Sequence, residues 1–541
     1  MNYGVLVGFI VYLVILAYIG WWANRYTKTT AQYFVGGRKI KILGAALSDK
    51  ASDMSGWLML GYPGQAFSAG IGALWAAIGC LGSTLGNYIL TGPRLRIYAG
   101  KFRAITIPDY LEARLKDNTK LIRVLSAAFI LIFMTGYVTA QFAAGGKVFG
   151  ESFGVSTNTG IVITMIILTA YVIVGGFFAV VWTDVVQALF MLLALIAMPF
   201  VIVYNVGGFD HAIELINSAD PARLSPIGGL TGAAAVVFVV GYFAWFVNQW
   251  GYPHILTRYM SVEDPRKLRR PGIFISTIWE ILVLWSAFFA GFLGFALYTS
   301  GALDISDPEK IVPSVALAYL PPWLAGFIMA GIISAVMSTA DSQLLVAASA
   351  VENDIVERIF KVKLSQKSRV NISRIVVLVL ALFAMFSAIS GSKFVYGMVA
   401  AAAGGLAVGF APIMVLSLWW KRLTKWGGIA GMAYGLVSEI ILEKFIYGWA
   451  FNPNAPGVFG SIGAALDGIP VYFINFFITL IVMIIVSLLT KPPEEIEKLH
   501  KELFTKVPIH KQKDLKNAYE ARAQSQIENV VSYIVTSGLL P

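Results

Sequence analysis

ILGAALSDKASDMSGWLMLGYPGQ, residues 42–65, has the length of a membrane span but not the composition of one. Its two ends are apolar, whereas its middle holds serines, glycines and three charged side chains, Asp49, Lys50 and Asp53. A charge at mid-membrane costs at least ~2.5–3.5 kcal/mol, so such residues normally face a polar cavity on a transport path. We therefore expect a broken helix at an ion or substrate site. The alternative is a polar helix that packs against its neighbours with its charges paired.

The composition is that of a membrane protein. Of the 541 residues, 57% are hydrophobic and 13% are charged, whereas soluble chains carry about 25% charged residues. The first apolar run, residues 3–23, has no basic region before it and no small-residue cleavage site, so we expect a span and not a signal peptide. A single cysteine excludes an internal disulfide, and four scattered histidines argue against a histidine metal site. The net charge of +11 lies in alternate loops and does not predict nucleic-acid binding.

Hydropathy predicts an all-α polytopic membrane protein with about 13 transmembrane helices. We expect them near residues 3–23, 43–66, 71–92, 122–147, 158–181, 184–206, 231–256, 272–298, 314–346, 373–391, 394–420, 426–448 and 469–490. Basic residues crowd alternate loops, and Arg94, Arg123 and Arg258 count among these loop charges. Because basic loops face the cytoplasm, the N-terminus is expected outside and the C-terminus inside a cell membrane. The loop 209–229 is long enough for a short helix, and residues 491–541 form a charged cytoplasmic tail.

The ninth span contains oxygen-bearing side chains at helical spacing. Ser338, Asp341 and Ser342 stand at i, i+3 and i+4 and share one face, while Ala335 and Thr339 lie on an adjoining strip. A hard cation such as sodium is best held by carboxylate, hydroxyl and carbonyl oxygens. We therefore predict a sodium site on this face. The alternative is that the hydroxyls bond back to carbonyls of their own helix, as they often do in membranes.

Two further carboxylates lie within expected spans. Asp184 stands near the start of the sixth span, where it is either an ion-coupling residue or a helix N-cap. Glu280, in the eighth span, has no assigned role.

The seventh span, FVVGYFAWFVNQWGYPHIL at residues 238–256, alternates aromatic and amide side chains, and Gly251 and Pro253 are expected to interrupt its helix. We expect a pocket for a small zwitterion, lined by Trp245, Gln249, Trp250 and Tyr252. An aromatic belt at the membrane interface is the alternative.

The second and seventh spans are both interrupted by glycine and proline, and they stand five spans apart. Matching breaks in two halves indicate an inverted-repeat transporter with its site near the bilayer midplane. The expected division is a first helix and loop (1–42), a first repeat of five helices (43–206), a second repeat of five (231–420), two additional helices (426–490) and the tail (491–541).

Several short motifs resemble those of the sodium/solute symporter family, and of its proline-transporting members in particular. The resemblance covers residues 3–490 and rests on YFVGGR (33–38), ASDMSGW (51–57), PDYLEAR (108–114), AVVWTDVVQA (179–188), PHILTRYM (253–260) and AVMSTADSQLLV (335–346). It implies the leucine-transporter-type five-plus-five inverted repeat and sodium-coupled uptake by alternating access.

The resemblance also implies site residues. A main sodium site would use the carbonyls of Ala51, Met54 and Ala335 with the hydroxyls of Ser338 and Thr339. Ion coupling or a second sodium would involve Asp53, Asp184, Asp341 and Ser342, and the substrate would lie against Ser55, Gly56, Trp57, Trp245, Gln249 and Pro253. The chain departs from the family pattern at Gln249, where proline symporters have tyrosine, and at Asp49 and Lys50, which replace small residues.

The predicted activity is sodium-coupled uptake of a small amino acid, with L-proline as first choice, and not catalysis. The alternative is a sodium- or proton-coupled symporter for another amino acid or a monocarboxylate. No cofactor is expected besides Na⁺ as coupling ion. The expected partners are the solute, Na⁺ and the lipid bilayer, and the oligomeric state is left open. A channel is not favoured, because the sequence shows no recognisable pore filter. A sensor or an enzyme is not favoured, because the sequence shows no soluble signalling or catalytic domain.

Overall fold

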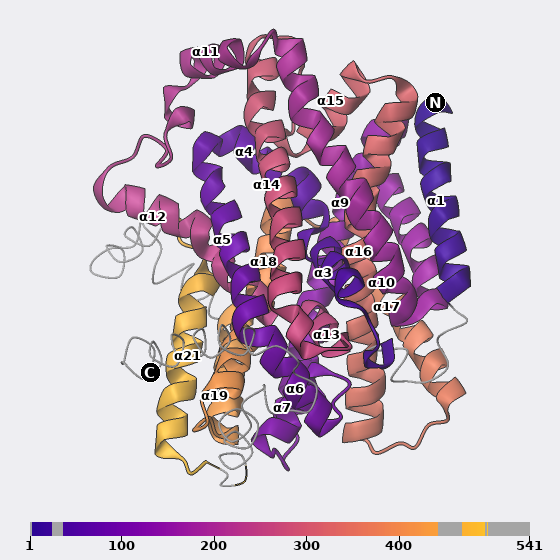
Figure 1. The fold of residues 1–541 in the computed structure, drawn as a ribbon, viewed down its shortest axis with the longest axis vertical. Coiled ribbons are helices and arrows are strands. Elements are labelled where there is room, and N and C mark those ends of the chain that lie inside the picture. The colour runs from indigo at the N-terminus through magenta and orange to yellow at the C-terminus, as the bar shows by residue number, and fades with distance from the viewer. Residues whose placement is uncertain (1–2, 24–35, 442–467, 493–494, 496–541) are drawn as a thin grey trace.

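The computed structural model describes residues 3–23, 36–441, 468–492 and 495. Within these ranges every named element is a helix, and an isolated bridge joins Ile40 to Val262. In Figure 1 long helices run side by side, with α1 (Tyr3–Ala23) along one edge of the bundle and α21 (Val471–Leu489) along the opposite edge. The predicted all-α fold is confirmed. The expected cytoplasmic tail lies outside the described residues apart from its first few.

The labels η mark short 3₁₀ or π segments, which often join or interrupt α-helices. After α1 the first part of the chain forms η2 (Gly36–Arg38), α3 (Ile42–Gly56), η3 (Trp57–Gly61), α4 (Tyr62–Ala69), η4 (Gly70–Ala73), α5 (Leu74–Gly86), η5 (Asn87–Thr91), α6 (Gly92–Phe102), α7 (Ile107–Leu115), α8 (Leu121–Phe129), η6 (Ile130–Met134), α9 (Thr135–Phe153) and α10 (Thr157–Val206). The second part forms α11 (Phe209–Ala219), η7 (Pro221–Leu224), α12 (Gly232–Phe243), η8 (Ala244–Val247), η9 (Gln249–Gly251), α13 (Pro253–Ser261), η10 (Pro265–Leu268), α14 (Arg270–Thr299), η11 (Pro308–Lys310), α15 (Ile311–Tyr319), α16 (Pro322–Ser349), η12 (Ala350–Ile359), α17 (Gln366–Ser390), α18 (Val395–Trp419) and α19 (Lys425–Val437), before α21.

In the described part of the chain, nine helical segments are long and apolar enough to cross a membrane, and residues 3–19 and 157–173 are shorter apolar helices. The count of about 13 spans stays a prediction, because the end of the twelfth expected span lies outside the described residues. The short helix expected in the loop 209–229 is present as α11.

The fifth and sixth expected spans form the single element α10, yet its two halves approach the same point. Tyr171 donates to the carbonyl of Met337 over 3.2 Å. Gln187 donates to Tyr12 over 2.9 Å, and the Tyr12 hydroxyl in turn reaches the Met337 sulfur at 3.6 Å. In a straight helix residues 171 and 187 would be about 24 Å apart. Both halves of α10 therefore contact the surroundings of Met337 in α16.

Both expected interruptions are present. Ser55 has φ 56° and ψ −175°, a backbone conformation that breaks α3 one residue before its end. In the seventh span α12 ends at Phe243, two 3₁₀ segments follow, and Tyr252 is extended before Pro253 opens α13. The break in α3 thus occurs beside the charged residues that predicted it.

The buried helix α16 is uninterrupted and packs closely against α1. A side chain on Gly8 would place its Cβ 2.5 Å from the backbone of Gly326, and one on Gly326 would lie 2.7 Å from the Val5 carbonyl. Glycines allow this approach, which supplies the van der Waals contact that holds membrane helices together.

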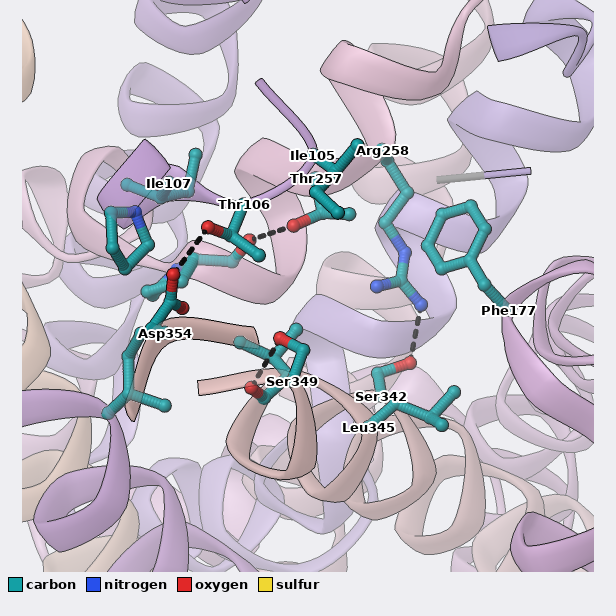
Figure 2. Close-up of a pocket in the computed structure, with 14 residues that line it drawn as sticks. Ile105, Thr106, Ile107, Phe177, Thr257, Arg258, Ser342, Leu345, Ser349 and Asp354 are labelled. Carbon is teal, nitrogen blue, oxygen red and sulfur yellow. Dashed lines mark hydrogen bonds between the residues drawn. The ribbon is translucent and has the colours of Figure 1, made fainter. Parts of the chain in front are cut away.

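A narrow cavity lies near the end of the bundle that carries α7, between α7, α13 and α16 (Figure 2). Its volume is about 20 Å³, and Arg258 and Ser342 line it together with Thr106 and Asp354. It therefore lies along the last turns of α16, from Ser342 to Ser349.

The close approach of α1 and α16 predicts that Gly8→Ala lowers the melting temperature in detergent by a few degrees, because overpacking costs about 1–3 kcal/mol. Gly136→Ala in α9 is the matched control, since its Cβ would meet its nearest neighbour, Ala402, at an ordinary 3.7 Å. Equal melting temperatures for the two variants would contradict the packing.

Candidate ion and substrate site

The break in α3 rests against the middle of α16. Ser338 donates to the Ala51 carbonyl over 2.8 Å and to the Ala335 carbonyl over 3.2 Å. Thr339 donates to the carbonyl of Ser52 over 2.9 Å. All five residues are fully buried. Three of the predicted sodium ligands, two carbonyls and the Ser338 hydroxyl, therefore meet at one place between the two helices.

The other two predicted sodium ligands are nearby but turned to other partners. The Met54 carbonyl accepts the backbone N–H of Trp57, and the Thr339 hydroxyl points to Ser52 and not to Ala51. A hydroxyl that donates one hydrogen bond still has lone pairs to offer a cation. Ser338 also donates to the Ala335 carbonyl of its own helix, as the alternative to a sodium site expected. Both interpretations therefore apply to this hydroxyl.

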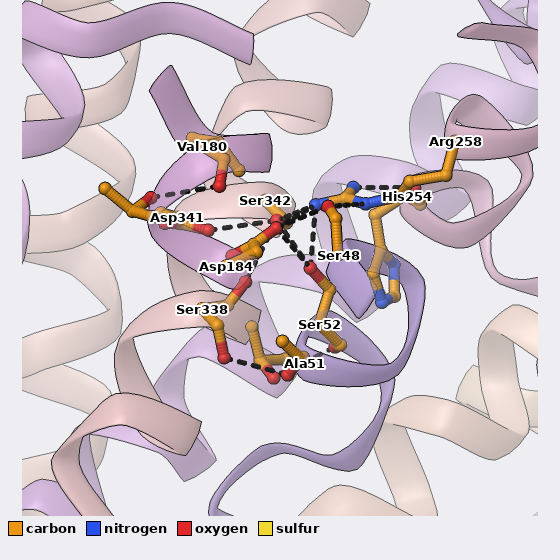
Figure 3. Close-up of polar contacts among 12 residues, drawn as sticks. Ser48, Ala51, Ser52, Val180, Asp184, His254, Arg258, Ser338, Asp341 and Ser342 are labelled. Carbon is orange, nitrogen blue, oxygen red and sulfur yellow. Dashed lines mark hydrogen bonds and ion pairs between the residues drawn. The ribbon is translucent and has the colours of Figure 1, made fainter. Parts of the chain in front are cut away.

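The contact between α3 and α16 is called the seam below. A buried arginine, Arg258, lies beside this seam (Figure 3). Nη2 of Arg258 contacts Asp184 Oδ2 at 3.0 Å and Ser52 Oγ at 2.7 Å, and it also contacts Ser342 Oγ. Nε of Arg258 donates to Ser48 over 3.1 Å. Two oxygens predicted for a second sodium, on Asp184 and Ser342, are therefore held by the guanidinium. A sodium ion bound to both would have to displace it.

Asp341 completes this cluster. Its Oδ1 accepts from Ser342 over 2.9 Å, and its Oδ2 accepts from the Tyr171 hydroxyl. Asp184 lies inside α10 and accepts from Ser48 over 2.6 Å, so the alternative that it serves as a helix N-cap is wrong. Counting Arg258 as a loop charge was also wrong, because it lies in α13 and is 1% exposed.

A second buried cluster surrounds Lys50. Its ammonium group donates to Thr84 over 2.7 Å and to Asp53 over 3.1 Å, and it lies 3.4 Å from Glu280. Gln249 donates to Asp53 over 2.7 Å and accepts from Thr84 over 2.8 Å. The cluster connects α3, α5 and α14 to η9, the interrupted part of the seventh span. Glu280, which had no assigned role, is therefore a counter-ion of Lys50.

Asp49 faces a different set of partners. Its Oδ2 accepts from the hydroxyls of Tyr88 and Tyr259 at 2.7 and 3.2 Å. Lys50 pairs with Asp53 and Glu280. The charges of α3 are thus satisfied by an ion pair within the helix, by Glu280 and by tyrosine hydroxyls, close to what one interpretation of the sequence expected. The helix is also broken, as the other interpretation expected.

Aromatic rings gather on the far side of the break. The ring centroid of Trp57 lies 4.6 Å from that of Trp245 and 5.0 Å from that of Tyr62. Nε1 of Trp245 donates to the Tyr396 hydroxyl over 3.1 Å. Trp57 and Trp245 were predicted to line a pocket, and here they pack against each other. Pro253 lies across the seam, where it lines the narrow cavity.

The backbone at the break carries further polar groups. Gly56 N–H donates to Gln141 Oε1 over 2.8 Å, and Ser55 Oγ accepts the Trp57 N–H over 3.0 Å. Three buried donors near the break have no hydrogen-bond partner among the described residues: Trp57 Nε1, Tyr62 Oη and Gln141 Nε2. Unpaired buried donors are costly, which makes them available to a polar ligand.

Sequence reasoning missed several members of these clusters. Ser48 and Ser52 lie in the polar stretch 42–65, and Ser52 also lies in the ASDMSGW motif, but neither was given a role. Thr84 carries a small hydroxyl that no quoted motif contains. Gln141 and Tyr396 likewise lie in apolar spans; an isolated amide within a span was the available signal. Of the other predicted pocket residues, Trp250 turns away to donate to Ser83, and Tyr252 stacks on His254.

Comparison with known proteins identifies the family of the chain. A model described as "Sodium:solute symporter family" matches residues 33–435. The high-affinity proline transporter PutP of Bacillus subtilis (strain 168) is 37% identical over 436 residues, which are 79% of this chain and 91% of the relative. The sodium/proline symporter of Escherichia coli (strain K12) is 36% identical over 469 residues, 85% of this chain and 91% of the relative.

Two further likenesses extend over nearly the whole chain. The osmoregulated proline transporter OpuE of Bacillus subtilis (strain 168) is 34% identical over 494 residues, 91% of this chain and 96% of the relative. A Na⁺-coupled sialic acid symporter, solved in a substrate-bound outward-open state, aligns with a TM-score of 0.72 at 20% identity, covering 91% of this chain and 98% of that one. The last comparison shows a shared fold. The chain is an integral membrane transporter that belongs to the sodium:solute symporter family.

Proposed function

We propose that this chain takes up a small amino acid, L-proline first, together with Na⁺ by alternating access. The observation that carries the proposal is the convergence of Ala51 O, Ala335 O and Ser338 Oγ where α3 breaks against α16. Carbonyl and hydroxyl oxygens are the ligands that a hard monovalent cation prefers. The proline transporters among the relatives support the choice of substrate.

The charges of the two buried clusters also support cation coupling. Lys50 faces the carboxylates of Asp53 and Glu280, and Arg258 pairs with Asp184, next to Asp341. Each cluster therefore holds one carboxylate more than its basic side chain can neutralise. An excess carboxylate inside a membrane protein is expensive, and a bound cation or proton compensates it. We assign Asp53, Asp184 and Asp341 to ion coupling on this ground, and Ser342 because its hydroxyl contacts both Asp341 and Arg258.

For the substrate we propose the space at the break, beside Ser55, Gly56 and Trp57. The carboxylate of an amino acid would accept from the unpaired donors of Trp57 and Gln141, near the N-terminal end of the helix that resumes after Ser55. Trp245 would cover the apolar part of the solute. Gln249 would act indirectly, since its amide is bonded to Asp53 and Thr84, and Pro253 would begin the facing helix α13.

The proposed architecture is two inverted repeats, residues 43–206 and 231–420, that rock around this site. The position of the two interruptions supports it, one in each proposed repeat. The N-terminal end of α1 and the loop helix α11 lie at one end of the bundle, opposite α7 (Figure 1). With the basic loops inside, this arrangement supports an outside N-terminus.

Coupling would be a thermodynamic linkage, in which sodium and substrate favour each other's binding by the same factor. One positive charge that crosses 100 mV supplies ~2.3 kcal/mol, enough for about a fifty-fold solute gradient. The sodium gradient would add to this. The alternative is another small solute or coupling to protons. Gln249 in place of tyrosine supports a solute other than proline. The excess carboxylates support coupling to protons.

The proposal predicts accumulation of radiolabelled L-proline in proteoliposomes under an inward sodium gradient, but not under an equal potassium gradient at equal pH. The control is the same vesicles without protein. Sodium-dependent uptake of a different small solute would retain the ion site and reassign the substrate. Uptake that follows a proton gradient and ignores sodium would contradict the proposed coupling.

The sodium site predicts that Ser338→Ala combined with Thr339→Ala raises the external sodium concentration for half-maximal uptake roughly tenfold or more, because two oxygen ligands are lost. Ser334→Ala is the matched control, since this buried hydroxyl of α16 bonds to the Ala330 carbonyl of its own helix. Unchanged sodium dependence in a well-expressed double variant would rule out this assignment.

The cluster around Lys50 predicts a stability effect. Lys50→Met should cost about 3–5 kcal/mol, because it leaves Asp53 and Glu280 buried without their cation. Adding Glu280→Gln to that variant should recover part of the loss, and a double-mutant cycle of melting temperatures measures the coupling. Additive effects of the two substitutions, or a Lys50→Met protein as stable as the parent, would contradict the ion pairs.

A further inference from the structure

The narrow cavity beside α7 leads away from the predicted ion site. Arg258 and Ser342 line its inner end, and Thr106 and Asp354 line its outer end (Figure 2). Its volume of about 20 Å³ has room for one water-sized particle. Apolar side chains of Ile107, Ile130 and Leu345 form much of the wall. A water molecule or an ion inside would therefore be hydrogen-bonded or coordinated by the few oxygen atoms that line the cavity.

Asp354 supplies one such oxygen. Its Oδ1 is fully engaged: it accepts from Thr106 over 3.1 Å, from Asn353 over 3.0 Å and from Nη1 of Arg123. Its Oδ2 is buried and has no partner among the described residues, although the side chain is 0% exposed and lines the cavity. A buried carboxylate oxygen without a partner is costly unless a ligand completes it.

Hydroxyl groups in the same cavity complement that carboxylate. Ser349 and Thr257 each donate to a carbonyl of their own helix, at 2.8 and 2.7 Å, which leaves their oxygen lone pairs free to accept or to coordinate. Thr106 and Ser342 add two more oxygens along its length. At the outer end a carboxylate among hydroxyls fits a hard monovalent cation, whereas the Arg258 guanidinium lies at the inner end of the cavity.

Arg123 separates this cavity from a second one. The guanidinium pairs with Asp354 on the inner side, with Asp109 at 2.9 Å and with Glu112 at 2.6 Å. Asp109, Glu112 and Arg123 line the second cavity, which has a volume of about 450 Å³, whereas Asp354 lines the first. One arginine and its carboxylates thus stand between the inner cavity and a wide vestibule at the end of the bundle that carries α7.

We propose that the inner cavity is an exit site for the transported sodium ion, ligated by Asp354 Oδ2 and the hydroxyls of Thr106 and Ser349. The ion would reach it from the seam between α3 and α16, past Ser342, and would leave for the vestibule when the ion pairs of Arg123 open. This inference rests on the proposed sodium coupling and on the proposed cytoplasmic position of the basic loops. It gives the PDYLEAR motif, which contains Asp109 and Glu112, a place in the transport path.

The test uses right-side-out membrane vesicles from cells that produce the full chain, loaded with increasing sodium. Internal sodium should occupy the exit site and inhibit net uptake of labelled L-proline. Asp354→Asn keeps the side-chain shape and the acceptor for Thr106 but removes the charge. It should raise the internal sodium concentration for half-inhibition roughly tenfold, the effect of losing one charged ligand, and leave the external sodium dependence unchanged.

Asp117→Asn is the matched control, because its carboxylate also lines the outer cavity but accepts from the backbone N–H groups of Thr119 and Ile122 and not from Arg123. It should leave inhibition by internal sodium as in the parent. Ser349→Ala, a smaller change, should shift the inhibition in the same direction as Asp354→Asn and keeps the test decisive if that variant does not fold.

Equal half-inhibition in the parent, Asp354→Asn and Ser349→Ala would overturn the exit site while leaving sodium coupling intact. Inhibition that follows internal pH and not internal sodium would overturn it as well, because the site would then take a proton. Failure of the proposed function has a different signature, namely the absence of sodium-dependent uptake in the parent protein itself.

Discussion

Polar groups in the middle of α3 are buried from bulk solvent and from lipid, so the surrounding helices must satisfy them. Lys50 and Asp53 meet Thr84, Glu280 and Gln249 on one side. On the other side the carbonyls of Ala51 and Ser52 are covered by hydroxyls of α16. The break at Ser55 occurs where these two sets of contacts meet. The arrangement of α5, α14 and α16 around α3 follows from this need.

Much of this was predictable from the sequence, because a charged segment inside an apolar run leaves few physical solutions. The breaks in the second and seventh spans, the all-helical fold and the meeting of Ala51 with Ser338 all followed from local pattern or from family resemblance. The partners of the charges did not. Lys50 and Glu280 are 230 residues apart, and no local spacing pairs them. Arg258 resembled a loop charge because it follows an interrupted span, whereas the fold turns it inward.

The two clusters have the same composition, one basic side chain and two carboxylates, and both are tied to interrupted segments. Arg258 belongs to α13, which begins after the second interruption, and the Lys50 cluster reaches η9 through Gln249. A cation that enters either cluster changes the balance of contacts that hold α3 against its neighbours. Ion binding and helix rearrangement are therefore linked by the same groups, as a coupled transporter requires. The cavity toward Asp354 extends this link to one end of the bundle.

Calorimetric titration of the purified protein with L-proline, at a series of sodium concentrations and in potassium of equal ionic strength, measures that linkage directly. Sodium should raise the affinity for L-proline, and L-proline should raise the affinity for sodium by the same factor. Unequal factors would point to an additional bound species. Affinity for L-proline that is the same in sodium and in potassium would contradict coupling through the seam between α3 and α16.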